Sequence, residues 1–125
     1  SVEAVTTNLC PCSKEISEAG AHNQRCHIKI MCEQKPEKWV WIEDIIELAE
    51  ASSSCEIFSI LKREDEKYVT EKAYNNPAFV EDVVRSCYNK LSKISELDSF
   101  RIEATAKESI HLHDARAIME SRCNK

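Results

Sequence analysis

The sequence predicts an α+β fold in which helices cover one face of an antiparallel sheet. Three observations point to it: two strand-like runs near the N-terminus, helical spacing of apolar residues in the middle, and two further strand-like runs near the C-terminus. The coarse order is strand, strand, helix, helix, strand, strand. With 125 residues, the chain is long enough to bury one core, so residues 1–125 are expected to form a single domain.

Strand-like residues occur in four places. Residues 2–8 are rich in Val and Thr, which favour extended structure. In residues 26–33 and 100–107, apolar and polar side chains alternate, as expected of a strand with one buried face. A last strand is predicted over residues 115–121. Together these runs predict a four-stranded sheet.

Two helices are predicted between the two pairs of strands. The first covers residues 39–52, where Trp41 shares one face with other apolar side chains. The second begins with Asn76 as its cap and Pro77 in the first helical position, which suits a residue without a backbone N–H. Residues 55–74 have no clear period, and their structure is left open.

The composition disfavours several classes of protein. The formal net charge of −5 argues against a general nucleic-acid binder. No apolar run is long enough for a transmembrane helix or resembles a secretory signal, so no membrane partner is expected. The seven cysteines are an odd number without framework spacing. This pattern favours reduced thiols in a cytoplasmic protein over a secreted disulfide framework.

Cysteine, histidine and glutamate side chains form four motifs that could carry chemistry. These are the pair Cys10 and Cys12, the single His22, the pair Glu64 and Glu66, and the pair His111 and His113. Each motif also has a simpler explanation. The thiols could be small buried side chains, and the single histidine could fix a turn. The glutamates could be part of a solvated charge run, and the late histidines could decorate a hairpin.

Taken together, the four motifs indicate a metal site. A thiolate, one or two imidazoles and a carboxylate form a ligand set that suits Zn, Fe(II) or Mn better than Ca or Mg. Such a set leaves a coordination position for water, which a divalent metal makes nucleophilic near neutral pH. Whole secondary-structure elements separate the motifs, so the site requires the fold to bring them together.

Five motifs stand in the same order as in a known enzyme family. They are CPCSKEIS (residues 10–17), GAHNQR (20–25), DEKYVTE (65–71), NPAFVED (76–82) and ESIHLH (108–113). Together they closely resemble the C-terminal half of the type IB GTP cyclohydrolases, including their archaeal relatives. The resemblance covers nearly the whole chain, and CPCSKEIS is its most specific motif.

This resemblance implies a tunnelling fold, whose modules have a four-stranded antiparallel sheet with two helices between the second and third strands. It implies an enzyme that hydrolyses GTP to a dihydroneopterin phosphate and formate, the first step of folate and pterin biosynthesis. Family members carry a second such module on the N-terminal side. The chain is therefore expected to be one half of a two-module enzyme, and to pair with that module or with itself as a dimer to tetramer.

The resemblance also implies a metal site and proton-transfer groups. The residues that match those around one divalent transition metal are Cys10, His22, Glu66 and His111. Cys10 is also expected to act directly in catalysis. His22 and His113 are candidates for proton transfer, since imidazole works as acid and base near neutral pH.

The substrate-binding residue that the resemblance implies is Glu81, which matches the glutamate that anchors guanine. A carboxylate suits this role because it accepts from two adjacent N–H donors. Without the resemblance, Glu81 would be assigned to a surface ion pair with Arg85, four residues on. Basic residues near the motifs could meet the triphosphate, namely Lys14, Arg25, Lys62, Arg63 and Lys67.

Two other functions are compatible with the sequence. One is a non-catalytic tunnelling module that only binds a purine or builds an oligomer. The other is a nitrile reductase of the same fold, with Cys10 as its nucleophile. The reductase needs a nicotinamide site, and the sequence has no dinucleotide fingerprint. A bound metal would favour the cyclohydrolase over both alternatives.

Overall fold

The computed structural model describes residues 1–121, and within them all five strands form one antiparallel sheet in the order β3-β1-β2-β4-β5. The strands are β1 (Val2–Leu9), β2 (Asn23–Gln34), β3 (Cys55–Glu56), β4 (Leu97–Ala106) and β5 (Ala115–Glu120). The four predicted strands are confirmed. The prediction of a four-stranded sheet is wrong, because β3 pairs with β1 at one edge. Two residues are too few to produce an alternating pattern.

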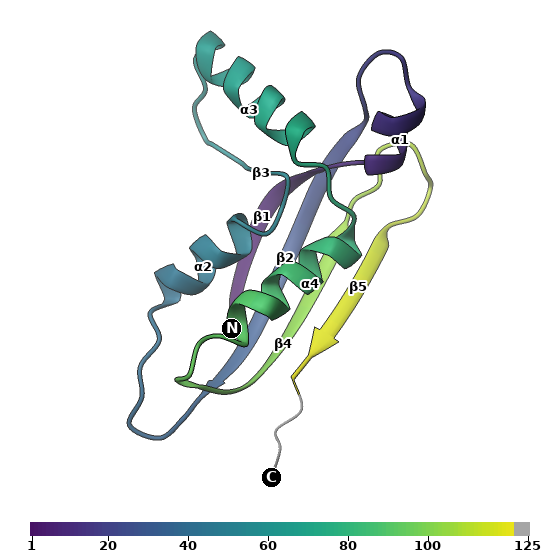
Figure 1. Cartoon of the computed structure of the whole chain (residues 1–125). Helices are drawn as coiled ribbons and strands as arrows, with labels where there is room; N and C mark the ends of the chain where they lie inside the picture. The colour runs from purple at the N-terminus through teal and green to yellow at the C-terminus, as the bar shows by residue number, and fades with distance from the viewer. Residues whose placement is uncertain (122–125) are drawn as a thin grey trace.

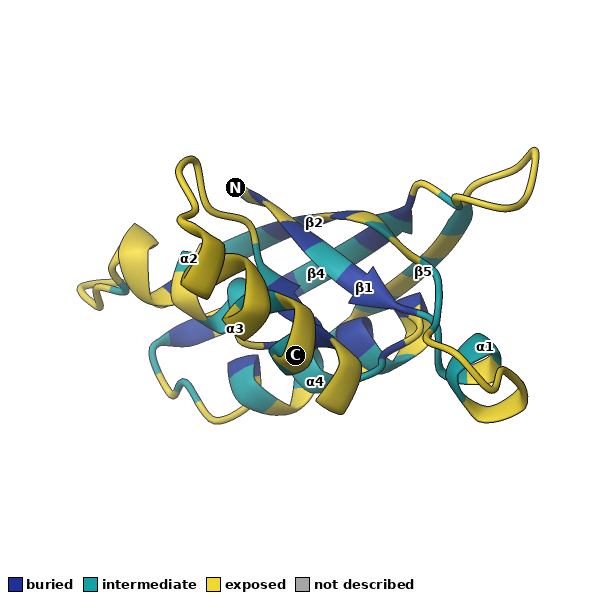
Figure 2. Cartoon of the chain, turned by 90° about the horizontal axis from the view of Figure 1, so that it is seen from above, coloured by how far each residue is buried: buried dark blue, intermediate teal, exposed yellow. Residues whose placement is uncertain are grey.

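Two helices cover one face of the sheet, as Figure 1 shows. These are α2 (Ile42–Glu50) and α4 (Val80–Leu91). On α4, Val83, Cys87 and Leu91 are completely buried and share a core with strand residues such as Ile28 and Ile102. Figure 2 shows the corresponding alternation of buried and exposed positions along the strands. The α+β prediction, with helices on one face, is therefore confirmed.

The helix α3 (Arg63–Asn75) occupies most of the segment whose structure was left open. It extends beyond the sheet as an arm (Figure 1), and Ala73 is its only buried residue in the described chain. Because α3 is almost entirely solvated, its sequence carries charges rather than an apolar stripe. Three helices thus lie between β2 and β4 in residues 1–121, and the expectation of two is wrong.

Both predicted helix starts lie too early in the chain. Trp41 is the extended N-cap of α2 and is 73% exposed, so its predicted place on the buried face is wrong. The first turn instead carries acidic Glu43 and Asp44, which favour a helix N-terminus.

The second helix starts later than predicted because a different residue caps it. The helix α4 begins at Val80, and the Asp82 carboxylate accepts the N–H of its N-cap Phe79 at 3.0 Å. Asn76 does not cap this helix; it ends α3 and donates its amide to the Ser53 carbonyl at 2.9 Å.

A short helix, α1 (Pro11–Ile16), follows β1 directly. It falls within the segment that the sequence predicts as a loop or short helix. Pro11 starts α1, where a missing backbone N–H costs nothing. In residues 1–121, no helix is both long and apolar enough to cross a lipid bilayer.

Candidate functional site

A cleft of about 290 Å³ lies where the end of β1, the start of α4 and the β4–β5 connection meet. Its chemically active lining residues are Cys10, Cys12, His22, Gln24, Glu81, Glu108, His111 and His113. The fold therefore brings together five of the six predicted site residues, which come from four separate segments of the sequence.

Backbone and hydroxyl hydrogen bonds hold Cys10 against His22. The Cys10 N–H donates to the His22 carbonyl at 3.0 Å. The Ser13 hydroxyl donates to the Cys10 carbonyl at 3.1 Å and accepts the His22 N–H at 3.2 Å. Ser13 was not among the predicted site residues, although its place three residues after Cys10 is typical of a side chain that bonds back to the start of a helix.

The His22 ring is oriented through one of its nitrogens. Its Nδ1 lies 3.0 Å from the Gln24 amide oxygen and 3.2 Å from the Ser109 hydroxyl. Gln24 and Ser109 were also missed from sequence. Gln24 could have been found, because residues two apart at the start of a strand point to the same side.

The two late histidines form a stacked pair on the β4–β5 connection. The rings of His111 and His113 lie 5.1 Å apart between centroids, with an interplanar angle of 11°. An ion pair of 2.8 Å between Lys107 and Asp114 closes the connection on which they lie. Both histidines line the cleft.

Glu81 lies exposed in the first turn of α4, at the rim of the cleft. The simpler assignment, an ion pair with Arg85, is wrong, because Arg85 bonds Asp82 at 2.9 Å instead. Within residues 1–121 the Glu81 carboxylate makes no hydrogen bond or ion pair of its own. It is therefore free to accept from a ligand.

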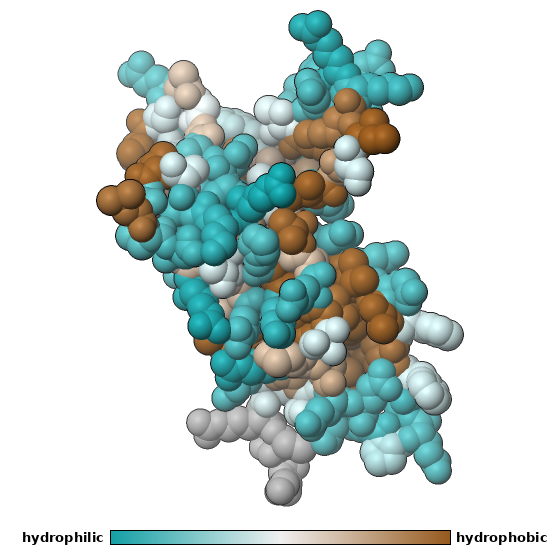
Figure 3. All heavy atoms as spheres, turned by 180° about the vertical axis from the view of Figure 1, so that it is seen from behind, coloured by the Kyte–Doolittle hydropathy of each residue, from teal (hydrophilic) through white to brown (hydrophobic). Residues whose placement is uncertain are grey.

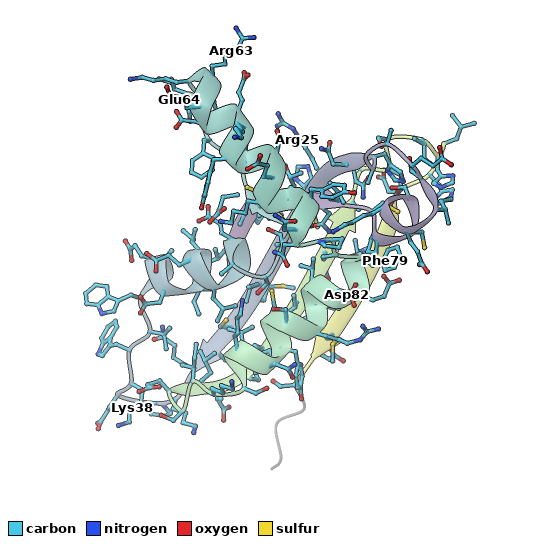
Figure 4. All side chains as sticks on the ribbon, turned by 45° about the horizontal axis from the view of Figure 1, so that its top comes forward. Arg25, Lys38, Arg63, Glu64, Phe79 and Asp82 are labelled. Carbon is cyan, nitrogen blue, oxygen red and sulfur yellow. The ribbon has the colours of Figure 1, made fainter. Side chains whose placement is uncertain are left out.

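Glu66 is the one predicted site residue that does not line the cleft. It lies on α3 beside Glu64, Arg63 and Lys67. Figure 4 shows Arg63 and Glu64 at the outer end of α3, far from Phe79 at the cleft. In the described part of the chain, no three Cys, His, Asp or Glu side chains lie close enough together to hold a metal ion, and this includes the cleft residues Cys10, His22 and His111.

The cysteines differ in burial, and Cys32 on β2 is half-buried, away from the cleft lining. The six within residues 1–121 are free thiols, and Cys26, Cys55 and Cys87 are buried. Burial raises the pKa of the Cys26 thiol to about 12 and also raises the pKa of Cys87. Both therefore stay protonated and inert. Cys10 and Cys12 are accessible and line the cleft.

Comparison with known proteins gives a consistent result. Residues 1–117 match the family model described as type I GTP cyclohydrolase folE2. The chain is 54% identical over 119 residues to a "GTP cyclohydrolase FolE2" of Nitrosospira multiformis, covering 95% of this chain and 44% of the relative. It is 56% identical over 112 residues to the protein of that name from Dictyoglomus turgidum, covering 90% and 43%. The chain thus spans less than half the length of these curated relatives.

Proposed function

Because the chain belongs to the type I GTP cyclohydrolase folE2 family, we propose that it forms part of an enzyme that converts GTP and water to a dihydroneopterin phosphate and formate. The observation that carries the proposal is the cleft in which a thiol, imidazoles and an unpaired carboxylate meet. The product would open a folate or pterin pathway in the cytoplasm.

The donor chemistry of the cleft fits one divalent transition metal, Zn²⁺, Fe²⁺ or Mn²⁺. The Cys10 thiol is accessible, and His22 has its Nδ1 engaged, which leaves Nε2 for a ligand. A thiol and an imidazole suit metals of intermediate softness. The residues that would hold the metal are Cys10, His22, Glu66 and His111. When bound, the metal would supply a water nucleophile near neutral pH and stabilise developing negative charge.

The chain's own residues would bind the base and move protons. Glu81 would accept the two adjacent N–H groups of guanine, which orients the imidazole ring of the base with C8 toward the cleft. His113 would carry protons to and from the ring nitrogen and the leaving formate, a role open to His22 only where His22 does not hold the metal, and Cys10 would assist at the reacting carbon. Hydrolysis at C8 opens the ring, and a second hydrolysis releases formate.

Glu66 would reach this site from a neighbouring copy or module. Apolar side chains on the segment that leads from β3 into α3 are exposed, among them Phe58 at 45% and Ile60 at 86%. Ile110 and Leu112 are exposed beside the cleft on the β4–β5 connection. Figure 3 shows apolar atoms in both regions. Contact between such regions of neighbouring copies would bury apolar surface and carry Glu66, with Arg63 and Lys67, toward the cleft and the triphosphate.

The proposed assembly is a dimer to tetramer of tunnelling-fold modules, or a pair with an N-terminal module of the same fold. The five-stranded antiparallel sheet with helices on one face is compatible with such a module. Open sheet edges and an uncovered face favour association. In this assembly residues 1–125 form one module, the C-terminal half of a two-module enzyme.

The test is metal content, compared between Cys10→Ala and the matched control Cys12→Ala. After loading with Zn²⁺ or Mn²⁺ and removal of free ions, the wild-type assembly should hold about one metal per site, as a mononuclear ligand set predicts. Cys10→Ala should lose the metal and Cys12→Ala should keep it. Equal metal content in both variants would contradict the assignment of Cys10.

Formate release from GTP separates the enzyme from its alternatives. The isolated chain should release little or no formate, and addition of the N-terminal module should restore the activity. A non-catalytic module would bind purine without releasing formate under any of these conditions. A reductase would depend on a nicotinamide and keep its activity without metal.

A further inference from the structure

The His22 ring is approached at Nδ1 by two oxygens from different elements. The Gln24 amide oxygen, at 3.0 Å, belongs to β2, and the Ser109 hydroxyl, at 3.2 Å, belongs to the β4–β5 connection. The other ring nitrogen, Nε2, has no hydrogen-bond partner among residues 1–121. His22 itself lines the cleft together with Gln24.

The chemistry of these two oxygens selects one tautomer of the ring. An amide oxygen can only accept a hydrogen bond, so Nδ1 must carry the proton when it bonds Gln24. A hydroxyl can accept as well as donate, so Ser109 tolerates this arrangement. A neutral imidazole has only one N–H. The proton on Nδ1 therefore leaves a bare electron pair on Nε2.

The backbone around His22 is fixed independently of the ring. Its N–H donates to Ser13 and its carbonyl accepts from Cys10. The ring can thus change its tautomer or its rotation without loss of the local fold. What determines its orientation is the pair of contacts at Nδ1.

We propose that Gln24 is a positioning residue that, with Ser109, holds neutral His22 as the Nδ1–H tautomer and offers Nε2 to the cleft. The tautomer does not depend on the proposed function. Only the expectation that Nε2 binds a metal rests on it. A partner at the second ring nitrogen is the usual means by which proteins orient an imidazole ligand. Here the partner is a neutral amide, which orients the ring without adding charge to the cleft.

The tautomer is measured by ¹⁵N chemical shifts of the imidazole nitrogens in the metal-free chain at about pH 8.5, roughly two units above the ordinary imidazole pKa. The variant His22→Gln identifies the His22 signals. In wild type, Nδ1 should have the shift of a protonated nitrogen and Nε2 that of an unprotonated one. Gln24→Glu, which keeps an acceptor oxygen, should preserve this pattern. Gln24→Leu combined with Ser109→Ala should move most of the population to Nε2–H. His27, on the opposite face of β2, should stay unchanged throughout.

A metal titration of the assembled protein completes the test. Gln24→Leu should weaken Zn²⁺ binding about 10- to 100-fold, the usual effect of removing the partner of an imidazole ligand. Gln24→Glu keeps the acceptor and adds a negative charge, so it should bind Zn²⁺ at least as tightly as wild type. An Nε2–H signal in wild type, or an unchanged tautomer in the double variant, would overturn the inference. A wild-type protein that has the Nδ1–H tautomer but binds no metal would contradict the proposed function and support the positioning role of Gln24.

Discussion

The Lys14 ammonium joins the short helix after Cys10 to the C-terminal end of the α3 arm. It donates to the Tyr74 carbonyl at 2.6 Å and lies 4.4 Å from the centroid of the Tyr74 ring. Tyr74 lies in the last turn of α3, where unpaired carbonyls attract a cation. Lys14 is thus engaged within the chain, which argues against its expected role as a partner of the triphosphate.

Replacement of Lys14 by methionine should loosen the C-terminal end of α3. The methionine keeps an apolar stem but loses the charged donor, which should cost about 1 kcal/mol of local stability. Amide hydrogen exchange in the last turn of α3 should accelerate in Lys14→Met. The control is Lys67→Met, which removes an exposed lysine of the same helix and should leave that turn unchanged. Equal exchange in wild type and Lys14→Met would show that the contact does not hold the arm.

Glu81→Ala should weaken binding of GTP to the assembled protein. Loss of a charged acceptor for two N–H donors should cost at least roughly 2–3 kcal/mol, or about 30- to 150-fold in affinity. Arg85→Ala is the matched control on the same helix, because it removes only the surface pair with Asp82. Equilibrium dialysis with GTP checks both variants, and circular dichroism verifies that they fold. Unchanged GTP affinity in Glu81→Ala would show that Glu81 does not bind guanine and is only a solvated surface residue.

The layered fold follows from local sequence patterns, whereas its deviations arise from contacts that are not local. Apolar residues alternate with polar ones along β2 and recur every three or four residues along α4. These patterns indicate the buried face of each element, so both elements are predictable. The arm α3 has no such pattern of apolar residues, because almost none of its side chains is buried. The start of α4 was misplaced because Asn76 and Pro77 are good caps in isolation, while Asn76 instead bonds the Ser53 carbonyl, 23 residues away.

The candidate site was predicted in part, for similar reasons. Cysteine and histidine are residue types that commonly bind metals or act in catalysis, so they are candidates from sequence alone. The motif resemblance selected the ones that meet in the cleft. Gln24 and Ser109 were missed because amide and hydroxyl side chains are common. Their role depends on the fold, which brings these two residues, 85 positions apart in the sequence, to the same ring nitrogen of His22. Glu66 has the expected residue type, but no sequence pattern indicates whether it acts on its own copy or on a neighbour.

Mixing two defective variants should regenerate metal sites if Glu66 acts on a neighbouring copy. Cys10→Ala lacks one ligand in its cleft, and Glu66→Ala lacks the other on its arm. Each contact between the two variants, in the right orientation, joins an intact cleft to an intact arm. Bound Zn²⁺ per chain, measured after subunit exchange, should therefore rise above that of either variant alone.

The control for this experiment is a mixture of Cys10→Ala with His22→Gln. Both changes damage the same cleft, so no pairing of these two variants yields an intact one, and metal content should stay low. If Glu66 and Cys10 belonged to the same copy, the first mixture would behave like this control. That result would refute the shared site.

The ion pair between Glu56 on β3 and Lys72 on α3 should make the attachment of the arm pH-dependent. Their side chains lie 2.5 Å apart and are 27% and 34% exposed. The hydrogen bond from Lys72 lowers the pKa of Glu56, and the same bond raises the pKa of Lys72. Because the pKa of Glu56 is lower in the folded state, its charge stabilises the fold above the pKa of a carboxyl in the unfolded chain, about 4.3. This stabilisation is lost as the pH falls through the folded pKa. Because the pKa of Lys72 is higher in the folded state, its charge stabilises the fold below the pKa of a lysine in the unfolded chain, about 10.4. This stabilisation is lost as the pH rises through the folded pKa.

Glu56→Gln should therefore be less stable than wild type by about 0.5–1 kcal/mol between roughly pH 5 and pH 9, a modest value because both side chains are partly solvated. The difference should shrink toward zero in acid, where the wild-type carboxyl is protonated as well. Urea unfolding at a series of pH values measures it. Glu47→Gln, at an exposed position of α2, should show no such pH-dependent difference. A Glu56→Gln deficit that persisted below the pKa of the wild-type carboxyl would assign its cause to packing rather than to the charge of the pair.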